Sequence, residues 1–198
     1  THTREATNGN ESIPMYKMDK NDIIIRTSTV DDSVGKGTCH YQSWIETYTG
    51  LIDQDYLDKR SLEKCIALAY QYPSNTFVAI KAGKVIGFSA YHISRDKDLQ
   101  NYGEISAIYL YKNYHKQGVG KKMMESCYKA LSLYPNIMIY VLKTNIKAVA
   151  FYQYLGFKVD GHEKIVKVSK KTSLQEVRMI RENPMYKKTL DRIPPDTC

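Results

Sequence analysis

Two hydrophobic periods alternate along the chain, and each change of period marks a predicted secondary-structure element. Apolar residues three or four positions apart predict helices within about 31–50, at 61–72, after Gly118 and at 145–155. Short apolar or alternating runs predict strands at 23–26, 76–80, 85–91, 103–111, 137–142, 158–169 and 174–181. The segment Lys81-Ala82-Gly83-Lys84 between two of these strands predicts a hairpin turn.

The order of these elements predicts the fold class. A strand, a helix, a strand and a helix follow one another between residues 103 and 155, an order that predicts a central parallel pair of strands. Strands on either side of this pair are expected to be antiparallel. The sequence therefore predicts a mixed sheet flanked by helices, of class α/β or α+β.

The ends of the chain differ from the part between them. Residues 1–20 are polar and aperiodic, which predicts a disordered or added extension. Three prolines after Asn183 predict an irregular tail over 183–198, and one domain is expected over 21–182. No apolar run approaches the roughly 18 residues of a membrane helix, and the start shows no signal-peptide pattern, so we expect a cytoplasmic protein without membrane contact.

The segment 109–122 joins a hydrophobic strand to a glycine turn and a basic helix start. Free backbone N–H groups at a helix N-terminus, flanked by lysines, form an anion site that suits a pyrophosphate. Such glycine pairs also occur in ordinary tight turns that need a positive φ, so the segment alone leaves both interpretations open. Its spacing excludes two common phosphate loops, because a Walker loop requires glycine at His115 and a dinucleotide loop requires glycine at Met123.

A second segment, 144–157, predicts a capped helix. Thr144 or Asn145 is expected at the N-cap and Gly156 just after the C-terminus, with an apolar stripe between them. The stripe consists of Ala148, Phe151, Tyr152 and Leu155.

Together the two segments resemble the GNAT superfamily of acyl-CoA N-acyltransferases. Its first pattern, Arg or Gln followed by Gly-x-Gly/Ala after two further residues, is matched by Gly118 and Gly120. Its second pattern is matched by Asn145, Ala148, Phe151, Tyr152, Gly156 and Phe157. Where the family usually has Arg or Gln, this chain has His115, so a charged phosphate contact becomes pH-dependent or passes to Lys116 and Lys121. The match covers roughly residues 76–160.

The resemblance implies a GNAT-like, mainly antiparallel twisted sheet of six to seven strands and acetyl-CoA as the cofactor. It implies that backbone groups at the end of the 103–111 strand pair with the pantetheine amides. The expected cofactor contacts are Ile108, Tyr109, Leu110, His115, Lys116, Gln117, Gly118, Val119, Gly120, Lys121, Asn145, Ala148, Phe151 and Tyr152.

Two residues are expected to carry the proton transfers. The resemblance implies that Tyr152 is the general acid for the leaving thiolate, although a core tyrosine is the alternative. Glu104 is the candidate base and acceptor contact, because strict strand alternation places it on one face with Ser106, Ile108 and Leu110. His92 and His115 are weaker alternatives for the base.

Charge and aromatic residues bear on the acceptor. The net charge is +8, and residues 112–129 hold five lysines against one glutamate, around the predicted phosphate loop. This placement disfavours nucleic acid as the partner. Trp44 and Tyr48, with Tyr56, are expected walls of an acceptor pocket. A nearby group of carboxylates either attracts a cationic amine or caps helices in solvent; it consists of Glu46, Asp53, Asp55 and Asp58.

The four cysteines are irregularly spaced and contain no C-x-x-C pair, so we predict free thiols and no metal. The sequence predicts an acetyl-CoA-dependent N-acetyltransferase domain over 21–182, which acts by direct attack in a ternary complex on a primary amine of a small cationic molecule. Two alternatives stay open: acetylation of a protein N-terminus or lysine, and a non-catalytic acyl-CoA-binding module. A homodimer also stays open.

Overall fold

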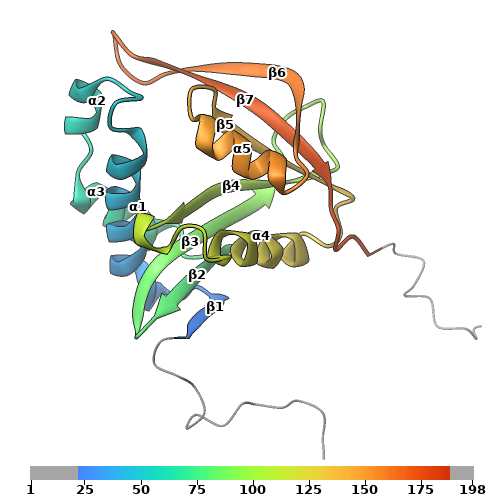
Figure 1. The fold of residues 1–198 in the computed structure, drawn as a ribbon, viewed down its shortest axis with the longest axis horizontal. Coiled ribbons are helices and arrows are strands. Elements are labelled where there is room, and N and C mark those ends of the chain that lie inside the picture. Colours follow the sequence, from blue (N-terminus) through green and yellow to red (C-terminus); the bar gives the residue numbers. More distant parts are fainter. Residues whose placement is uncertain (1–21, 188–198) are drawn as a thin grey trace, which may run out of the picture.

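The computed structural model describes residues 22–187, which form one seven-stranded sheet (Figure 1). The strand order is β1-β2-β3-β4-β5-β7-β6, and β4 with β5 is the one parallel pair among these strands. The predicted mixed, mainly antiparallel sheet is confirmed. The strands are β1 Ile23–Thr27, β2 Thr76–Lys81, β3 Lys84–Ile93, β4 Tyr102–Leu110, β5 Asn136–Leu142, β6 Lys158–Lys167 and β7 Ser173–Glu182.

Helices cover both faces of the sheet, and a short helix, α2, adds to the predicted ones. Cys39 of α1 packs with Val78 of β2, whereas Met123 of α4 packs with the next residue, Ala79. Since successive residues of a strand point to opposite faces, α1 and α4 lie on opposite faces. The helices are α1 Ser33–Tyr48, α2 Gln54–Asp58, α3 Leu62–Gln71, α4 Val119–Ala130 and α5 Ile146–Tyr154, with 3-10 turns η2 Val30–Asp32 and η3 Lys112–Tyr114. No helix within residues 22–187 is both long and apolar enough to cross a membrane.

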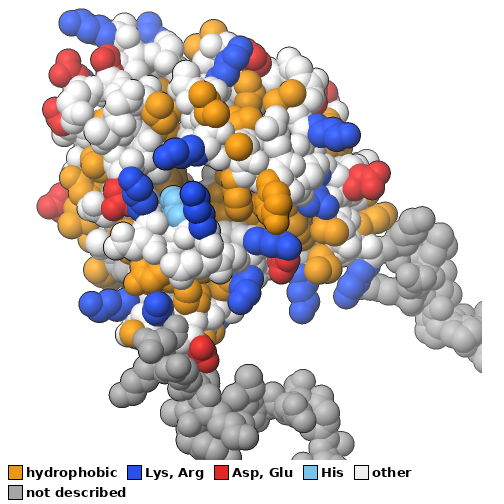
Figure 2. All heavy atoms as spheres, in the orientation of Figure 1, with side chains coloured by type: hydrophobic (Ala, Val, Ile, Leu, Met, Phe, Trp, Pro, Cys, Tyr) orange, Lys and Arg blue, Asp and Glu red, His pale blue; other side chains and the backbone are white. Residues whose placement is uncertain are grey.

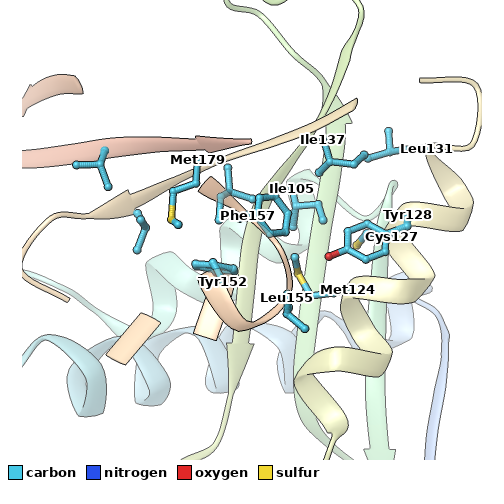
Figure 3. Packing of buried hydrophobic residues seen from close by; sticks show 13 residues of the cluster. Ile105, Met124, Cys127, Tyr128, Leu131, Ile137, Tyr152, Leu155, Phe157 and Met179 are labelled. Carbon is cyan, nitrogen blue, oxygen red and sulfur yellow. The ribbon is translucent and has the colours of Figure 1, made fainter. Parts of the chain in front are cut away.

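The main core lies between the sheet and the helices α4 and α5 (Figure 3). Tyr152 of the predicted 145–155 stripe and Phe157 meet Met124 and Cys127 there. On α4 the apolar positions Val119, Met123 and Cys127 are all buried, whereas in α3 only Cys65 is buried. Helix α3 therefore contributes less to the core than its sequence indicates.

The strands β4 and β5 separate after a short paired stretch. Their parallel pairing covers residues 102–104 and 136–138, after which β5 pairs along its whole length with β7 instead. Residues 105–110 of β4 therefore have a neighbouring strand on the β3 side only. Backbone groups on the other side face an opening in the sheet, and such groups need partners when water is excluded.

A bulge in β4 breaks the strict alternation that the sequence analysis assumed. The pairing of β4 with β3 skips Ser106, which is the extra residue of a β-bulge. Ile105 and Ile108 consequently both pack on the α4 face, although they are three residues apart. The expectation that Glu104 shares a face with Ser106, Ile108 and Leu110 is therefore wrong. Glu104 lies on the α1 face.

The end of β7 is tied to the end of α4. The buried Asn183 side chain donates hydrogen bonds to the carbonyl oxygens of Tyr128, Leu131 and Tyr134. This contact fixes where the chain leaves the sheet. The extension predicted at 1–20 and the end of the predicted tail, from 188 on, lie outside the described residues.

Candidate active site

A backbone cradle lies at the start of α4. Gly118 is the N-cap with φ of +80°, and the first bond of the helix runs from the Lys122 N–H to the Gly118 carbonyl oxygen, at 3.1 Å. The N–H groups of Val119, Gly120 and Lys121 make no hydrogen bond within the described residues. Three free donors at the positive end of a helix form an anion site.

The space around this cradle suits a ligand. A Cβ added to Gly118 would meet no atom within 4 Å, so the space beyond Gly118 is open. A Cβ on Gly120 would lie 3.2 Å from Cζ of Phe151, so glycine lets α4 approach α5 closely. Figure 2 shows lysine and arginine side chains gathered around a histidine over this part of the molecule. The exposed lysines near the cradle are Lys112, Lys116, Lys121 and Lys122.

His115 is turned toward β4. Its Nε2 atom lies 2.9 Å from the carbonyl oxygen of Leu110, so the ring joins the loop to the strand end. The side chain thus already has a backbone partner. Whether His115 or Lys116 and Lys121 would contact a phosphate here stays a prediction.

The three predicted pantetheine contacts on β4 are not equivalent. Tyr109 lies opposite Phe88 in the ladder, and the Tyr111 N–H donates to the Ile86 carbonyl oxygen at 3.0 Å. Because backbone groups alternate in direction along a strand, those of Tyr109 point toward β3 and those of Ile108 and Leu110 point into the opening. The Leu110 carbonyl oxygen is already taken by His115. Ile108 is the best placed of the three.

Tyr152 lies on α5, the helix that follows β5, in the core cluster against which Ile108 of β4 packs. Asn145 caps this helix by accepting a hydrogen bond from the Ala148 N–H at 3.2 Å, and Gly156 follows its end with φ of +92°, both as predicted. The Tyr152 side chain is buried, yet its hydroxyl makes no hydrogen bond within residues 22–187. Burial raises the pKa of Tyr152 strongly, and the neighbouring phenol of Tyr48 raises it further.

Glu104 lies at the end of the parallel pairing, next to His92. Its Oε2 atom is 3.1 Å from His92 Nε2, and both side chains are mostly buried. Burial raises the pKa of Glu104, whereas His92 and Lys164 oppose the rise. Two of the three candidate bases, Glu104 and His92, therefore form one pair, with Glu104 on the α1 face.

The predicted acceptor walls form one aromatic group on the α1 face. The Trp44 ring centroid lies 4.7 Å from that of Tyr48 and 5.5 Å from that of Tyr56. These rings pack with Leu142 and with the Tyr109 side chain, next to the opening. Burial raises the pKa of Tyr48 and of Tyr109, so both phenols stay protonated.

The four carboxylates of the predicted acidic group lie in solvent, three of them with local partners. Asp53 Oδ2 accepts from Thr172 Oγ1 at 2.8 Å, and Asp58 Oδ1 accepts from Gln54 Nε2 at 2.8 Å. Glu46 accepts from the Lys112 N–H at 3.4 Å. This is the solvated alternative that the sequence analysis had left open.

Sequence reasoning missed two charged residues of the α1 face. Glu176 lies opposite Leu142 on β7 and beside Leu174, both of which pack with the Trp44 group. Arg60 lies over the Trp44 ring, with its guanidinium carbon 4.0 Å from the ring centroid. The sequence shows Glu176 only as a polar position in an alternating strand. Its place near the opening follows from the order of the strands, which the sequence pattern does not contain.

This arrangement agrees with what comparisons with known proteins find. A probable N-acetyltransferase of Mycobacterium tuberculosis is 25% identical over 155 residues, which are 73% of this chain and 84% of that protein. A probable spermine N(1)-acetyltransferase of Bacillus subtilis subsp. natto is 31% identical over 85 residues, which are 40% of this chain and 56% of that protein.

A solved structure has the same fold. The crystal structure of the PaiA N-acetyltransferase from Thermoplasma acidophilum in complex with coenzyme A matches with a TM-score of 0.60 at 22% identity, over 81% of this chain and 99% of that one. The model of the acetyltransferase (GNAT) family matches residues 40–157, which are more than half of this chain. The chain therefore belongs to the GNAT acetyltransferase family.

Proposed function

We propose that this protein transfers the acetyl group of acetyl-CoA to the primary amine of a small molecule that arrives as an ammonium cation. The observation that carries the proposal is the opening between β4 and β5. It begins beside Glu104 and ends near the cradle at Gly118, and Ile108 on its β4 side packs against the core cluster that contains Tyr152.

The residues present fit coenzyme A. The free N–H groups of Val119, Gly120 and Lys121 and the flanking lysines would hold the pyrophosphate. The backbone of Ile108 would pair with the pantetheine arm as a strand would. When bound, acetyl-CoA supplies a thioester whose carbonyl carbon accepts the amine.

The proton transfers have candidate groups. An ammonium ion must lose a proton before its nitrogen can attack, since its pKa is about 10. Glu104, mostly buried beside His92, would take this proton directly or through water. Tyr152 stays protonated because burial raises its pKa, so it would donate a proton to the leaving thiolate.

The acceptor would bind on the α1 face. Trp44, Tyr48 and Tyr56 form apolar walls there, and Glu176 on β7 lies opposite Lys164 without a salt bridge to it, so its carboxylate could also contact an ammonium group. The spermine N(1)-acetyltransferase relative supports an amine acceptor. Glu104 and Glu176, the carboxylates that lie on the sheet at the α1 face, would attract the ammonium group.

The test is thiol release from acetyl-CoA over a panel of polyamines, amino acids, aminoglycosides and basic peptides. The proposal expects amine-dependent release with a small amine. Release with peptides alone would favour acetylation of proteins instead. Binding of coenzyme A without release for any amine would favour a non-catalytic acyl-CoA-binding module.

A further inference from the structure

Arg60 is held in a fixed orientation at the acceptor side of the site. It lies between α2 and α3, and its guanidinium carbon is 4.0 Å from the centroid of the Trp44 ring. Trp44 is only 5% exposed and packs against Tyr48 and Tyr56. A planar guanidinium on a buried ring presents its donors in a defined plane.

This guanidinium has no acceptor within the described residues. Its Nε atom is buried without a hydrogen-bond partner, and Arg60 forms no ion pair there. Arg26 and Arg178 differ, since each binds carboxylates at distances between 2.7 and 2.9 Å. A buried donor without a partner is unfavourable, so such a group in a native protein calls for an explanation.

Arg60 lies close to the groups that carry the chemistry. Its positive charge lowers the pKa of the Tyr48 and Tyr109 phenols against the effect of burial, and the nearby Tyr152 phenol raises the pKa of Tyr109. The nearby His40 is neutral at physiological pH, because burial and, to a lesser extent, Arg60 lower its pKa to about 4. Arg60 therefore supplies the positive charge at this end of the aromatic group.

Glu176 supplies the opposite charge. It lies opposite Leu142, which packs in the same group as Trp44, and its charge acts on the Tyr48 phenol from the sheet side. The Tyr48 phenol is thus close to a guanidinium and to a carboxylate. Neither forms a salt bridge within residues 22–187, although Lys164 lies opposite Glu176 on β6. A site with both charges suits a ligand with an ammonium and an anionic group.

We propose that Arg60 binds a carboxylate of the acceptor, so that the enzyme acetylates amino-acid-like molecules rather than simple amines. A carboxylate accepts two parallel hydrogen bonds from a guanidinium, which would give the buried Nε–H of Arg60 its missing partner. This inference rests on the proposed function and narrows it, because a polyamine would leave Arg60 without an acceptor.

The experiment compares amines that differ by one carboxylate. Ornithine and putrescine form one pair, lysine and cadaverine a second, and tyrosine and tyramine a third. Thiol release gives kcat/KM for each acceptor with the wild type, with Arg60→Gln, with Arg60→Lys and with Lys59→Gln. Lys59 is exposed one residue away, so its substitution removes the same charge outside the site.

We expect the wild type to prefer the carboxylated member of at least one pair by about 10- to 100-fold, the size of a charged hydrogen bond. Arg60→Gln should remove this preference by raising KM for that member alone. Arg60→Lys should retain part of it, and Lys59→Gln all of it. Equal or better use of the decarboxylated amines by the wild type, or an equal loss for both members in Arg60→Gln, would overturn the inference.

Binding can also be read without turnover, because Trp44 is the only tryptophan of the chain. Carboxylated ligands should change its fluorescence in the wild type and not in Arg60→Gln, in which folding is checked by thermal melting. If carboxylates bind in this way but no amine releases thiol, the proposed function fails and the anion site stands. If amines release thiol but carboxylates leave Trp44 fluorescence unchanged, the anion site fails and the proposed function stands.

Discussion

Replacing Tyr152 by phenylalanine tests the acid role most selectively, because the structure predicts a loss of rate without a loss of stability. The hydroxyl has no hydrogen-bond partner within residues 22–187, so its removal leaves no described group unsatisfied. Loss of a hydroxyl that makes no hydrogen bond is close to neutral. The melting temperature of Tyr152→Phe should therefore stay within about 2 °C of the wild type.

The rate should respond differently. A positioned general acid contributes about 10²- to 10⁴-fold, which corresponds to about 3 to 5 kcal/mol of transition-state stabilisation at 1.36 kcal/mol per tenfold change. We expect kcat of Tyr152→Phe to fall by this factor while the Kd for coenzyme A stays within about twofold of the wild type. The fall should appear in single-turnover kinetics, which isolate the chemical step.

Tyr128→Phe is the matched control. Tyr128 belongs to the same core cluster, and its buried hydroxyl also lacks a hydrogen-bond partner, but it projects from α4. This variant should keep the wild-type rate. If Tyr152→Phe retains more than half of the wild-type kcat, or if both variants lose rate equally, Tyr152 is a core residue and not the acid.

Three further predictions concern other parts of the site and the fold. Burial raises the pKa of Glu104 above its usual value of about 4.3, so activity should rise with pH through that raised pKa. In a pH–rate profile, Glu104→Gln should remove this rise and lower the maximal activity about 100-fold. In Gly118→Ala the added Cβ meets no atom, but the residue is forced into the left-handed backbone region. Calorimetry should therefore show weaker binding of coenzyme A, and denaturant unfolding should show a loss of about 1 to 2 kcal/mol in the free energy of unfolding. An unchanged affinity for coenzyme A would count against the cradle. Although burial opposes this, hydrogen bonds from Tyr140 and Arg178 lower the pKa of Asp96, and Arg178 lowers the pKa of Asp98 to about 2. The stability that these carboxylates add is therefore present above pH about 4 and is lost as the pH falls toward 2. Arg178→Gln should flatten acid unfolding in this window and lower stability at pH 7 by about 3 kcal/mol, since it removes the ion-pair partner of Asp96 and of the mostly buried Asp160; an unchanged acid transition would contradict this.

Local patterns were sufficient for most elements and for the turns and caps that flank α4 and α5. Asn145, Gly118 and Gly156 have backbone roles that depend on neighbours in sequence, so capping rules and positive φ predicted them. The buried stripe of α4 follows from helical periodicity in the same way.

The acceptor side depends on contacts that no local pattern contains. Ser106 has no property that marks it as a bulge, so the face of Glu104 could not be predicted. Arg60 and Glu176 approach the site because β7 lies beside β5 and because the chain between α2 and α3 crosses Trp44. In the sequence, Arg60 and Glu176 cannot be distinguished from ordinary surface charges, whereas the four carboxylates of the predicted acidic group form a visible cluster.

The central claim is that this chain moves an acetyl group from acetyl-CoA to an amine at the opening between β4 and β5. The most direct measurement follows thiol release and the acetylated amine in one reaction, by absorbance and by mass spectrometry. The account predicts that both products appear in a ratio of about one to one, only when an amine is present, and that Tyr152→Phe slows both. Thiol release that is independent of every amine tested, or tight binding of coenzyme A without any acetylated product, would contradict it.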